Sequence, residues 1–263
     1  MMPEKTQIID LNNYKNINEF QFSDLPLDNQ YAVLVKTGGK IKFDEVLRYS
    51  ETLGETLVYG DKNYYTFDTI DVENELHYDG ISSGGVRPIP DWLIFYLEDK
   101  PAVEGGEFRV LNCESVLYDL DQETIDVLEN IPLELYGLKY YFEPNPKPYD
   151  LSFSINTIVN EGGARVLRMH LPTDDVDFVT VERDYVYCKI DSFRLRFKGM
   201  NGVETAEIFD RLRKVCYSEK HLMEISLDEG DILFMNNRYA FHGRKKCATT
   251  TTRVMHRIQV VCK

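Results

Sequence analysis

The sequence predicts a mainly β protein with flanking helices, built around a double-stranded β-helix, the jelly roll of cupin-like proteins. Three observations favour this class: many short strand-like runs bounded by turn residues, few amphipathic helical segments, and an aromatic content of 12%. No repeat, low-complexity run or Gly/Ser-rich linker divides the 263 residues. We therefore expect residues 1–263 to form a single domain.

The N-terminal third predicts one strand, one helix and then further strands. The apolar run from Tyr31 to Lys36 ends at Gly38-Gly39, a pattern typical of a strand followed by a turn. Apolar side chains then recur at helical spacing over residues 43–53, and Gly54 ends this predicted amphipathic helix. The tyrosine-rich residues 64–72 and the apolar run 92–97 predict the next strands.

The remainder of the chain predicts two helices among short strands. Asp121 is a suitable N-cap for a helix that Pro132 ends, and residues 203–217 place their apolar side chains on one face of a second helix. His170 lies at a predicted strand end, where we expect a structural role. The predicted strands are residues 133–142, 165–169, 179–181, 185–190, 221–227, 232–235 and 253–261.

The charge of the chain is strongly negative but unevenly distributed. Asp and Glu number 44 and Lys and Arg 30, a formal net charge of −14. An acidic surface repels phosphate groups, so a nucleic-acid or anionic-membrane partner is not expected and a small-molecule substrate is favoured. After Asp231 there are no acidic residues but seven basic ones. This segment is either a solvated basic terminus or part of a pocket for a small carboxylate.

The N-terminus, the apolar runs and the cysteines bear on the compartment of the protein. The N-terminus has no apolar signal core and the chain has no run of about eighteen apolar residues, which predicts a cytoplasmic protein. The five cysteines are odd in number and widely spaced, so we expect reduced thiols rather than disulfides or a zinc knuckle. The sequence does not decide between a monomer and a homo-oligomer.

Two histidines and one aspartate are the candidate metal ligands. His77 and Asp79 lie two residues apart, and at a strand end such residues share a face about 6 to 7 Å apart. A His-x-Asp triplet alone is also consistent with a hydrogen-bonded surface pair. His242, which follows a predicted buried strand, completes a facial triad that leaves three metal positions open, as in non-haem Fe(II) oxygen chemistry.

Two arginines follow on the last predicted strand. Alternation would turn Arg253 and Arg257 to one face and His256 to the other. A guanidinium offers a planar fork for a carboxylate, but residues four apart on a strand are about 13 Å apart, too far to grip the same group easily. One arginine is therefore expected to bind a cosubstrate and the other the substrate.

Taken together, these pieces resemble the taurine dioxygenase-like group of Fe(II)/2-oxoglutarate oxygenases. The matching motifs, in the family's order, are His77-Tyr78-Asp79-Gly80, Gly105-Gly106-Glu107, the run 230–243 and Arg253-Val254-Met255-His256-Arg257. The resemblance implies that His77, Asp79 and His242 bind iron, that Arg253 pairs with the far carboxylate of 2-oxoglutarate, and that O2 is the other cosubstrate. It also implies that Arg257 faces the active site and can bind an anionic part of the substrate.

One departure from the family concerns 2-oxoglutarate binding. The family commonly has Thr where this chain has Phe108, and a phenylalanine cannot donate that hydrogen bond. Either another group completes the site, or 2-oxoglutarate is bound more weakly, or a register shift of one residue offers Arg109. Arg109 and Asn74 are, with Arg257, the candidate substrate contacts.

The resemblance also bears on the reaction. Halogenating relatives replace the carboxylate of Asp79 with a small residue, so its retention favours hydroxylation, desaturation or a related hydrogen abstraction. The layout is similar to natural-product oxygenases, including carbapenem synthase and isonitrile-pathway enzymes, which predicts a role in secondary metabolism. Arg257 favours a small carboxylate-bearing or amino-acid-derived substrate. The alternative is a non-catalytic jelly-roll binding protein, which Phe108 favours. A zinc hydrolase is disfavoured because no general base is evident.

Overall fold

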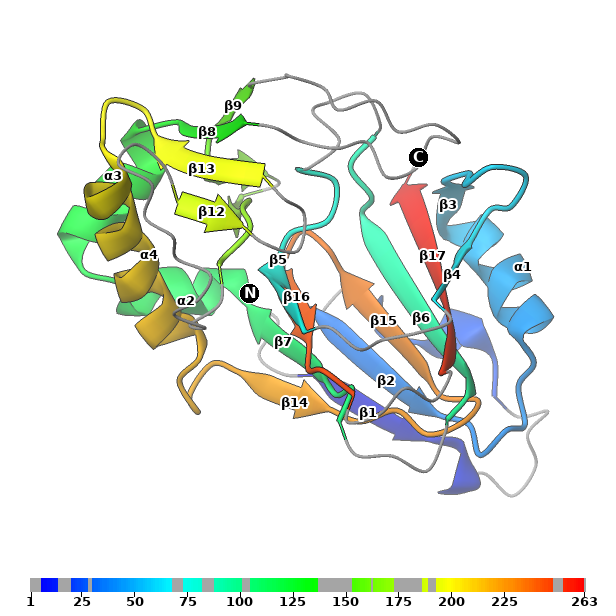
Figure 1. The fold of residues 1–263 in the computed structure, drawn as a ribbon. Helices are drawn as coiled ribbons and strands as arrows, with labels where there is room; N and C mark the ends of the chain where they lie inside the picture. Colours follow the sequence, from blue (N-terminus) through cyan, green and yellow to red (C-terminus); the bar gives the residue numbers. More distant parts are fainter. Residues whose placement is uncertain are drawn as a thin grey trace.

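The fold is taken from a computed structural model that places most of the chain (Figure 1). The residues it describes are 6–13, 20–27, 30–67, 73–81, 88–100, 105–136, 153–161, 163–172, 186–188, 193–247 and 253–262. The predicted strand at residues 179–181 lies outside this set. No helix in the described ranges is long and apolar enough to cross a membrane.

The largest sheet, here the major sheet, joins strands from both ends of the chain. In spatial order it comprises β1 (Gln7–Asp10), β2 (Ala32–Lys36), β15 (Ile232–Asn236), β6 (Trp92–Asp99), β17 (Val254–Cys262) and β3 (Gly54–Thr56), with β4 (Tyr65–Phe67) also paired to β17. β1 and β2 are parallel, and the other pairs are antiparallel. The C-terminal strand thus lies between β6 on one side and the short strands β3 and β4 on the other.

A second sheet, here the minor sheet, faces the major one across an apolar interior. Its spatial order is β14 (Met223–Ile225), β7 (Phe108–Asn112), β16 (Ala240–Arg244) and β5 (Asn74–His77). Phe95 and Leu233 of the major sheet pack in one cluster with Val110 and Ala240 of the minor sheet. Because alternate residues of each strand point inward, two facing sheets enclose one core. The predicted jelly-roll class is confirmed.

The first helix covers the outer face of the major sheet. α1 (Phe43–Leu53) has the predicted bounds, and the backbone N–H of Lys42 donates to the Glu45 carboxylate at its N-terminus. Its Val46 is fully buried in a cluster with Val35, Ile94 and Ile258 of the sheet. Two short 3-10 turns, Leu11–Asn13 and Phe22–Asp24, precede this layer.

The other helices lie on the outer face of the minor sheet, with two small sheets (Figure 1). The helices are α2 (Cys113–Asp119), α3 (Gln122–Asn130) and α4 (Gly202–Cys216). The small sheets are β12 (Val186–Cys188), β13 (Phe193–Phe197), β8 (Leu133–Tyr136) and β9 (Phe153–Ile155), and β10 (Ile158–Glu161) with β11 (Ala164–Leu167). The minor sheet is therefore covered on both faces.

Helix N-caps explain where these helices begin. The Asp121 side chain accepts from the Thr124 N–H at 2.9 Å, as its N-cap pattern predicts. Asn201 caps α4 by accepting from Val203 and Glu204. The sequence did not predict α2, although Asn112 caps it in the same way. With seven residues, α2 is too short to show a clear helical period.

Candidate metal centre

His77, Asp79 and His242 converge where two strands of the minor sheet pair. His77 ends β5, Asp79 follows it, and β16 places His242 directly opposite His77. The two imidazole rings are 4.3 Å apart between centroids. One donor atom from each of the three residues lies within 4.8 Å of the other two, and all three residues are buried. The ligands predicted from the motif therefore come together in space.

Hydrogen bonds orient His77 toward the centre of this cluster. The backbone carbonyl of Glu75 lies 2.7 Å from His77 Nδ1, and because a carbonyl can only accept, Nδ1 carries the proton. In the neutral ring, Nε2 is then an acceptor, and it lies 3.1 Å from Oδ1 of Asp79. Two acceptors at this distance require a cation or a proton between them. A metal ion supplies that cation, and the bond to Glu75 fixes the ring as ligand histidines require.

Asp79 is held by residues of the facing sheet. Arg257 Nη1 and Gln259 Nε2, both on β17, donate to Oδ2 at 3.1 Å and 2.6 Å. Burial acts to raise the pKa of Asp79, but the Arg257 guanidinium and the contact with His77 outweigh it and hold that pKa well below its ordinary value. Oδ2 is thus occupied by donors, and Oδ1 faces the histidines as an ionised ligand.

Burial keeps His242 and its neighbour His170 neutral. Burial, and then the proximity of His77, lower the pKa of His242 well below its ordinary value, and its buried Nδ1 has no hydrogen-bond partner among the described residues. His170 stacks on His77 at 5.1 Å, and burial lowers its pKa to about 3. Neutral imidazoles bind metals, and two histidines with one carboxylate match the donor set of non-haem Fe(II) sites. The residues present therefore fit iron.

Arg253 lies against the paired glycines that the sequence singled out. Its Nη1 donates to the carbonyl of Gly106 at 2.7 Å. Gly106 has φ +77°, and a Cβ there would overlap Arg253 Nη1 and lie 2.6 Å from Cys247 Sγ. Only glycine leaves room for the guanidinium at this position without backbone strain.

A third arginine, Arg244, joins this group, and the sequence did not single it out. It is two residues after His242 on β16, so both side chains lie on the same face. Its guanidinium lies 5.9 Å from the ring of Phe67, which is also 5.3 Å from the guanidinium of Arg257. Burial, and then repulsion from Arg253, lower the pKa of Arg244 to about 10, so it remains charged at neutral pH. The sequence signal that could have identified Arg244 is its position two residues after His242 on the same strand.

The structure does not bring Arg109 to the cluster. Phe108 packs inward, with its ring 4.7 Å from that of Phe95, so Arg109 projects from the opposite face of β7. There Arg109 forms ion pairs with Glu73 and Glu224 and lies over the ring of Tyr217. Asn74 opens β5 as the cross-strand partner of Arg244 and is partly exposed.

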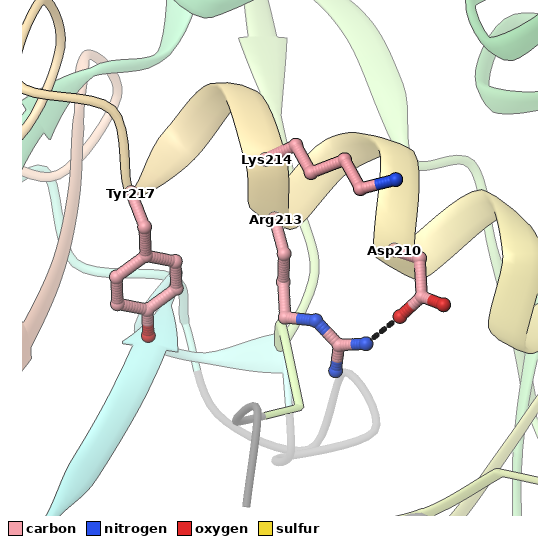
Figure 2. Close-up of a pocket in the computed structure, with 4 residues that line it drawn as sticks. All are labelled: Asp210, Arg213, Lys214 and Tyr217. Atoms are coloured by element: carbon pink, nitrogen blue, oxygen red, sulfur yellow. Dashed lines mark hydrogen bonds and ion pairs between the residues drawn. The ribbon is translucent and has the colours of Figure 1, made fainter.

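A pocket of about 440 Å³ lies on this outer side, along α4 (Figure 2). It is lined by Asp210, Arg213, Lys214 and Tyr217, and contains none of the three candidate ligands. Arg213 is ion-paired with Asp210 and donates to the carbonyl of Pro172 at 3.0 Å. The pocket is therefore separate from the metal cluster.

Comparisons with known proteins agree with this architecture. Residues 22–259 match the taurine catabolism dioxygenase TauD, TfdA family. PvcB of Pseudomonas aeruginosa has a TM-score of 0.65 at 14% identity over 89% of this chain and 76% of its own. A second PvcB structure, described as an Fe, alpha-ketoglutarate dependent oxygenase from an isonitrile synthetic pathway, gives 0.65 at 13% identity over 96% and 82%.

A proposed alpha-ketoglutarate-dependent taurine dioxygenase from Burkholderia xenovorans also has a TM-score of 0.65, at 15% identity over 100% of this chain and 92% of its own. At these identities the structures show the shared fold. No curated protein matches the chain in sequence. Because the family match spans nearly all of the chain, the protein belongs to the TauD, TfdA family of Fe(II)- and 2-oxoglutarate-dependent dioxygenases, which use O2.

Proposed function

We propose that His77, Asp79 and His242 bind the catalytic Fe(II), and that residues 1–263 act as one oxygenase domain. The observation that carries this proposal is the set of three buried donor atoms within 4.8 Å of one another. Three protein ligands leave three positions open, enough for a bidentate keto acid and O2. The iron with 2-oxoglutarate and O2 supplies the oxidant, and succinate and carbon dioxide are the coproducts.

Around this centre the chain's own residues position the reactants. Arg253 binds the distal carboxylate of 2-oxoglutarate, because a buried guanidinium near the centre matches that group. Arg257 and Gln259 keep the Asp79 carboxylate ionised and oriented. Phe95 and Phe108 make the inner wall apolar and exclude water from it.

The substrate in this proposal is a small carboxylate-bearing or amino-acid-derived molecule of secondary metabolism, which undergoes hydroxylation or desaturation. Two features support it. Arg257 has a buried Nε with no hydrogen-bond partner in the part of the chain that the structure describes, so it has a donor available for an anion. Its guanidinium lies within 6.0 Å of the rings of Tyr65 and Phe67, which favour an apolar portion next to that anion. A PvcB-like role in an isonitrile pathway is one form of this proposal.

The test uses purified protein under anaerobic conditions. We expect a visible charge-transfer absorption band when Fe(II) and 2-oxoglutarate are both added, and succinate release on admission of air. The variants His77→Ala and Asp79→Ala should each lose the band and lower succinate formation at least about a hundredfold, since a ligand contributes more than the groups that orient it.

A histidine that faces away from the centre provides the matched control. His256 is on β17, but its ring bonds to Thr66 and Glu98 beside α1. His256→Gln should keep the band. An absent band in the wild type, together with no succinate in air, would overturn the proposed function.

A further inference from the structure

Positive charge exceeds negative charge on the inner side of the paired strands β5 and β16. Arg244 has Arg253 and Arg257 as charged neighbours, and Arg257 lies beside Asp79, the carboxylate of the metal cluster. Arg257 is paired with that carboxylate. Arg253 donates to a backbone carbonyl, and Arg244 has no ion-pair partner among the described residues. Buried or half-buried guanidinium groups without a carboxylate are costly, so an anionic ligand is expected between them.

The course of β16 places Arg244 between the metal cluster and Arg253. Residues two apart on a strand lie about 6 to 7 Å apart on one face, so Arg244 lies that far along from His242. Just beyond it, the N–H of Lys245 donates to the carbonyl of Glu107 at 2.9 Å. The N–H of Gly106 donates to the carbonyl of Lys246 at 3.3 Å, and the carbonyl of Gly106 accepts from Arg253 Nη1.

The surroundings hold the Arg244 guanidinium in place without neutralising it. Its contact with the Phe67 ring is a cation–π interaction, which restrains the group but contributes no negative charge. Its Nε is buried and has no hydrogen-bond partner among the residues with described positions. Across the strand pair Arg244 lies opposite Phe108, whose side chain has no polar atom. The guanidinium therefore keeps donors available on the inner side.

We propose that Arg244 and Arg253 together bind the distal carboxylate of 2-oxoglutarate. This rests on the proposed function, which places the keto-acid end of the same molecule at His77, Asp79 and His242. The two ends of 2-oxoglutarate are separated by two methylene groups, a length comparable with the step from His242 to Arg244 along β16. Two guanidinium groups offer enough N–H donors to surround one carboxylate. Arg244 thereby supplies the donor that Phe108 does not.

The test measures equilibrium binding rather than turnover, on the Mn(II)-loaded protein with 2-oxoglutarate and with 2-oxopentanoate. The second ligand has the same keto-acid end but lacks the distal carboxylate. Arg244→Gln should weaken 2-oxoglutarate binding about 10- to 100-fold and change 2-oxopentanoate binding less than about twofold, because only the charged contact is lost. Lys245→Gln, at the neighbouring position on the outer side, is the matched control and should change neither Kd.

Arg244→Lys covers the case in which the glutamine variant does not fold. This variant retains the positive charge but loses the two parallel N–H donors of the guanidinium. A several-fold weaker affinity for 2-oxoglutarate, with an unchanged affinity for 2-oxopentanoate, supports the proposal. An unchanged Kd for 2-oxoglutarate in a folded Arg244 variant overturns it, and would leave the substrate anion as the partner of Arg244. If the wild type and Arg253→Gln both fail to distinguish the two ligands, the proposed function itself is contradicted.

Discussion

Arginines on the two sides of the minor sheet differ in whether they have carboxylate partners. On the outer face, Arg109 is paired with Glu73 and Glu224, and Arg213 on the adjacent helix is paired with Asp210. On the inner side, Arg244 of β16 and Arg253, which precedes β17 of the facing sheet, have no carboxylate partner among the residues described. Paired arginines contribute to the folded structure itself, whereas unpaired ones near a metal cluster leave charge for a ligand. The distinction lies in the partners of a residue and not in its type.

The largest effect should come from filling the space that Gly106 leaves for Arg253. Gly106→Ala combines backbone strain at φ +77° with overlap against Arg253 and Cys247. We expect it to lower the free energy of unfolding by about 2 to 4 kcal/mol and 2-oxoglutarate affinity at least about tenfold. Urea titration and calorimetry measure these two quantities.

Gly199 is the matched control, because it has φ +84° but a Cβ there would meet nothing within 4 Å. Gly199→Ala should cost about 1 kcal/mol of stability and leave the affinity unchanged. Equal affinity losses in both variants would show that strain alone, and not displacement of Arg253, explains the result.

A smaller change in the free energy of unfolding should distinguish the arginine on the outer face from the one on the inner face. Arg109→Gln removes the ion pair with Glu73 and one of the two ion pairs of Glu224, which keeps Lys245, and we expect the free energy of unfolding to fall by about 1 kcal/mol. Arg244→Gln removes a charge that no carboxylate of the described chain compensates. The ligand-free variant should be at least as stable as the wild type. If Arg244→Gln destabilises the ligand-free protein as much as Arg109→Gln, the contrast between the faces fails.

The most local effect, confined to metal affinity, concerns Gln259, whose side chain donates to Asp79 Oδ2. Gln259→Leu should weaken Mn(II) binding about tenfold, because the ligand carboxylate loses one of the donors that orient it. Paramagnetic resonance of free Mn(II) gives the Kd. Gln122→Ala, exposed on α3 beyond the outer face, serves as the control. An unchanged Mn(II) Kd for Gln259→Leu would mean that Arg257 alone orients Asp79.

Periodicity predicted the elements that have a clear repeat. The helix over residues 43–53 has the predicted bounds, and α4 differs from its prediction by one residue at each end. Strands β7 and β16 were not predicted as strands, because their inward and outward residues are both apolar in part and glycine interrupts β16. Such strands become evident only when both faces of the sheet are seen to be covered.

The metal cluster could be anticipated from motif order, but its supporting residues could not. His77 and His242 are distant in sequence, and only the pairing of β5 with β16 sets them opposite each other. Arg109 and Phe108 are neighbours on β7, and strand alternation sends them to different faces, which the register shift considered for Arg109 did not allow for. Gln259 and His170 contact the cluster through tertiary packing, for which the sequence offers no local signal.

The bonds to Asp79 also bear on how the protein folds. Its carboxylate is bound by residues 178 and 180 positions later in the chain. Contacts of such high sequence separation form slowly, because a long loop must close before they are made. The capacity to bind metal should therefore arise with the last steps of refolding, when β17 takes its place beside β6. Metal affinity thus reports whether the chain has reached its native topology.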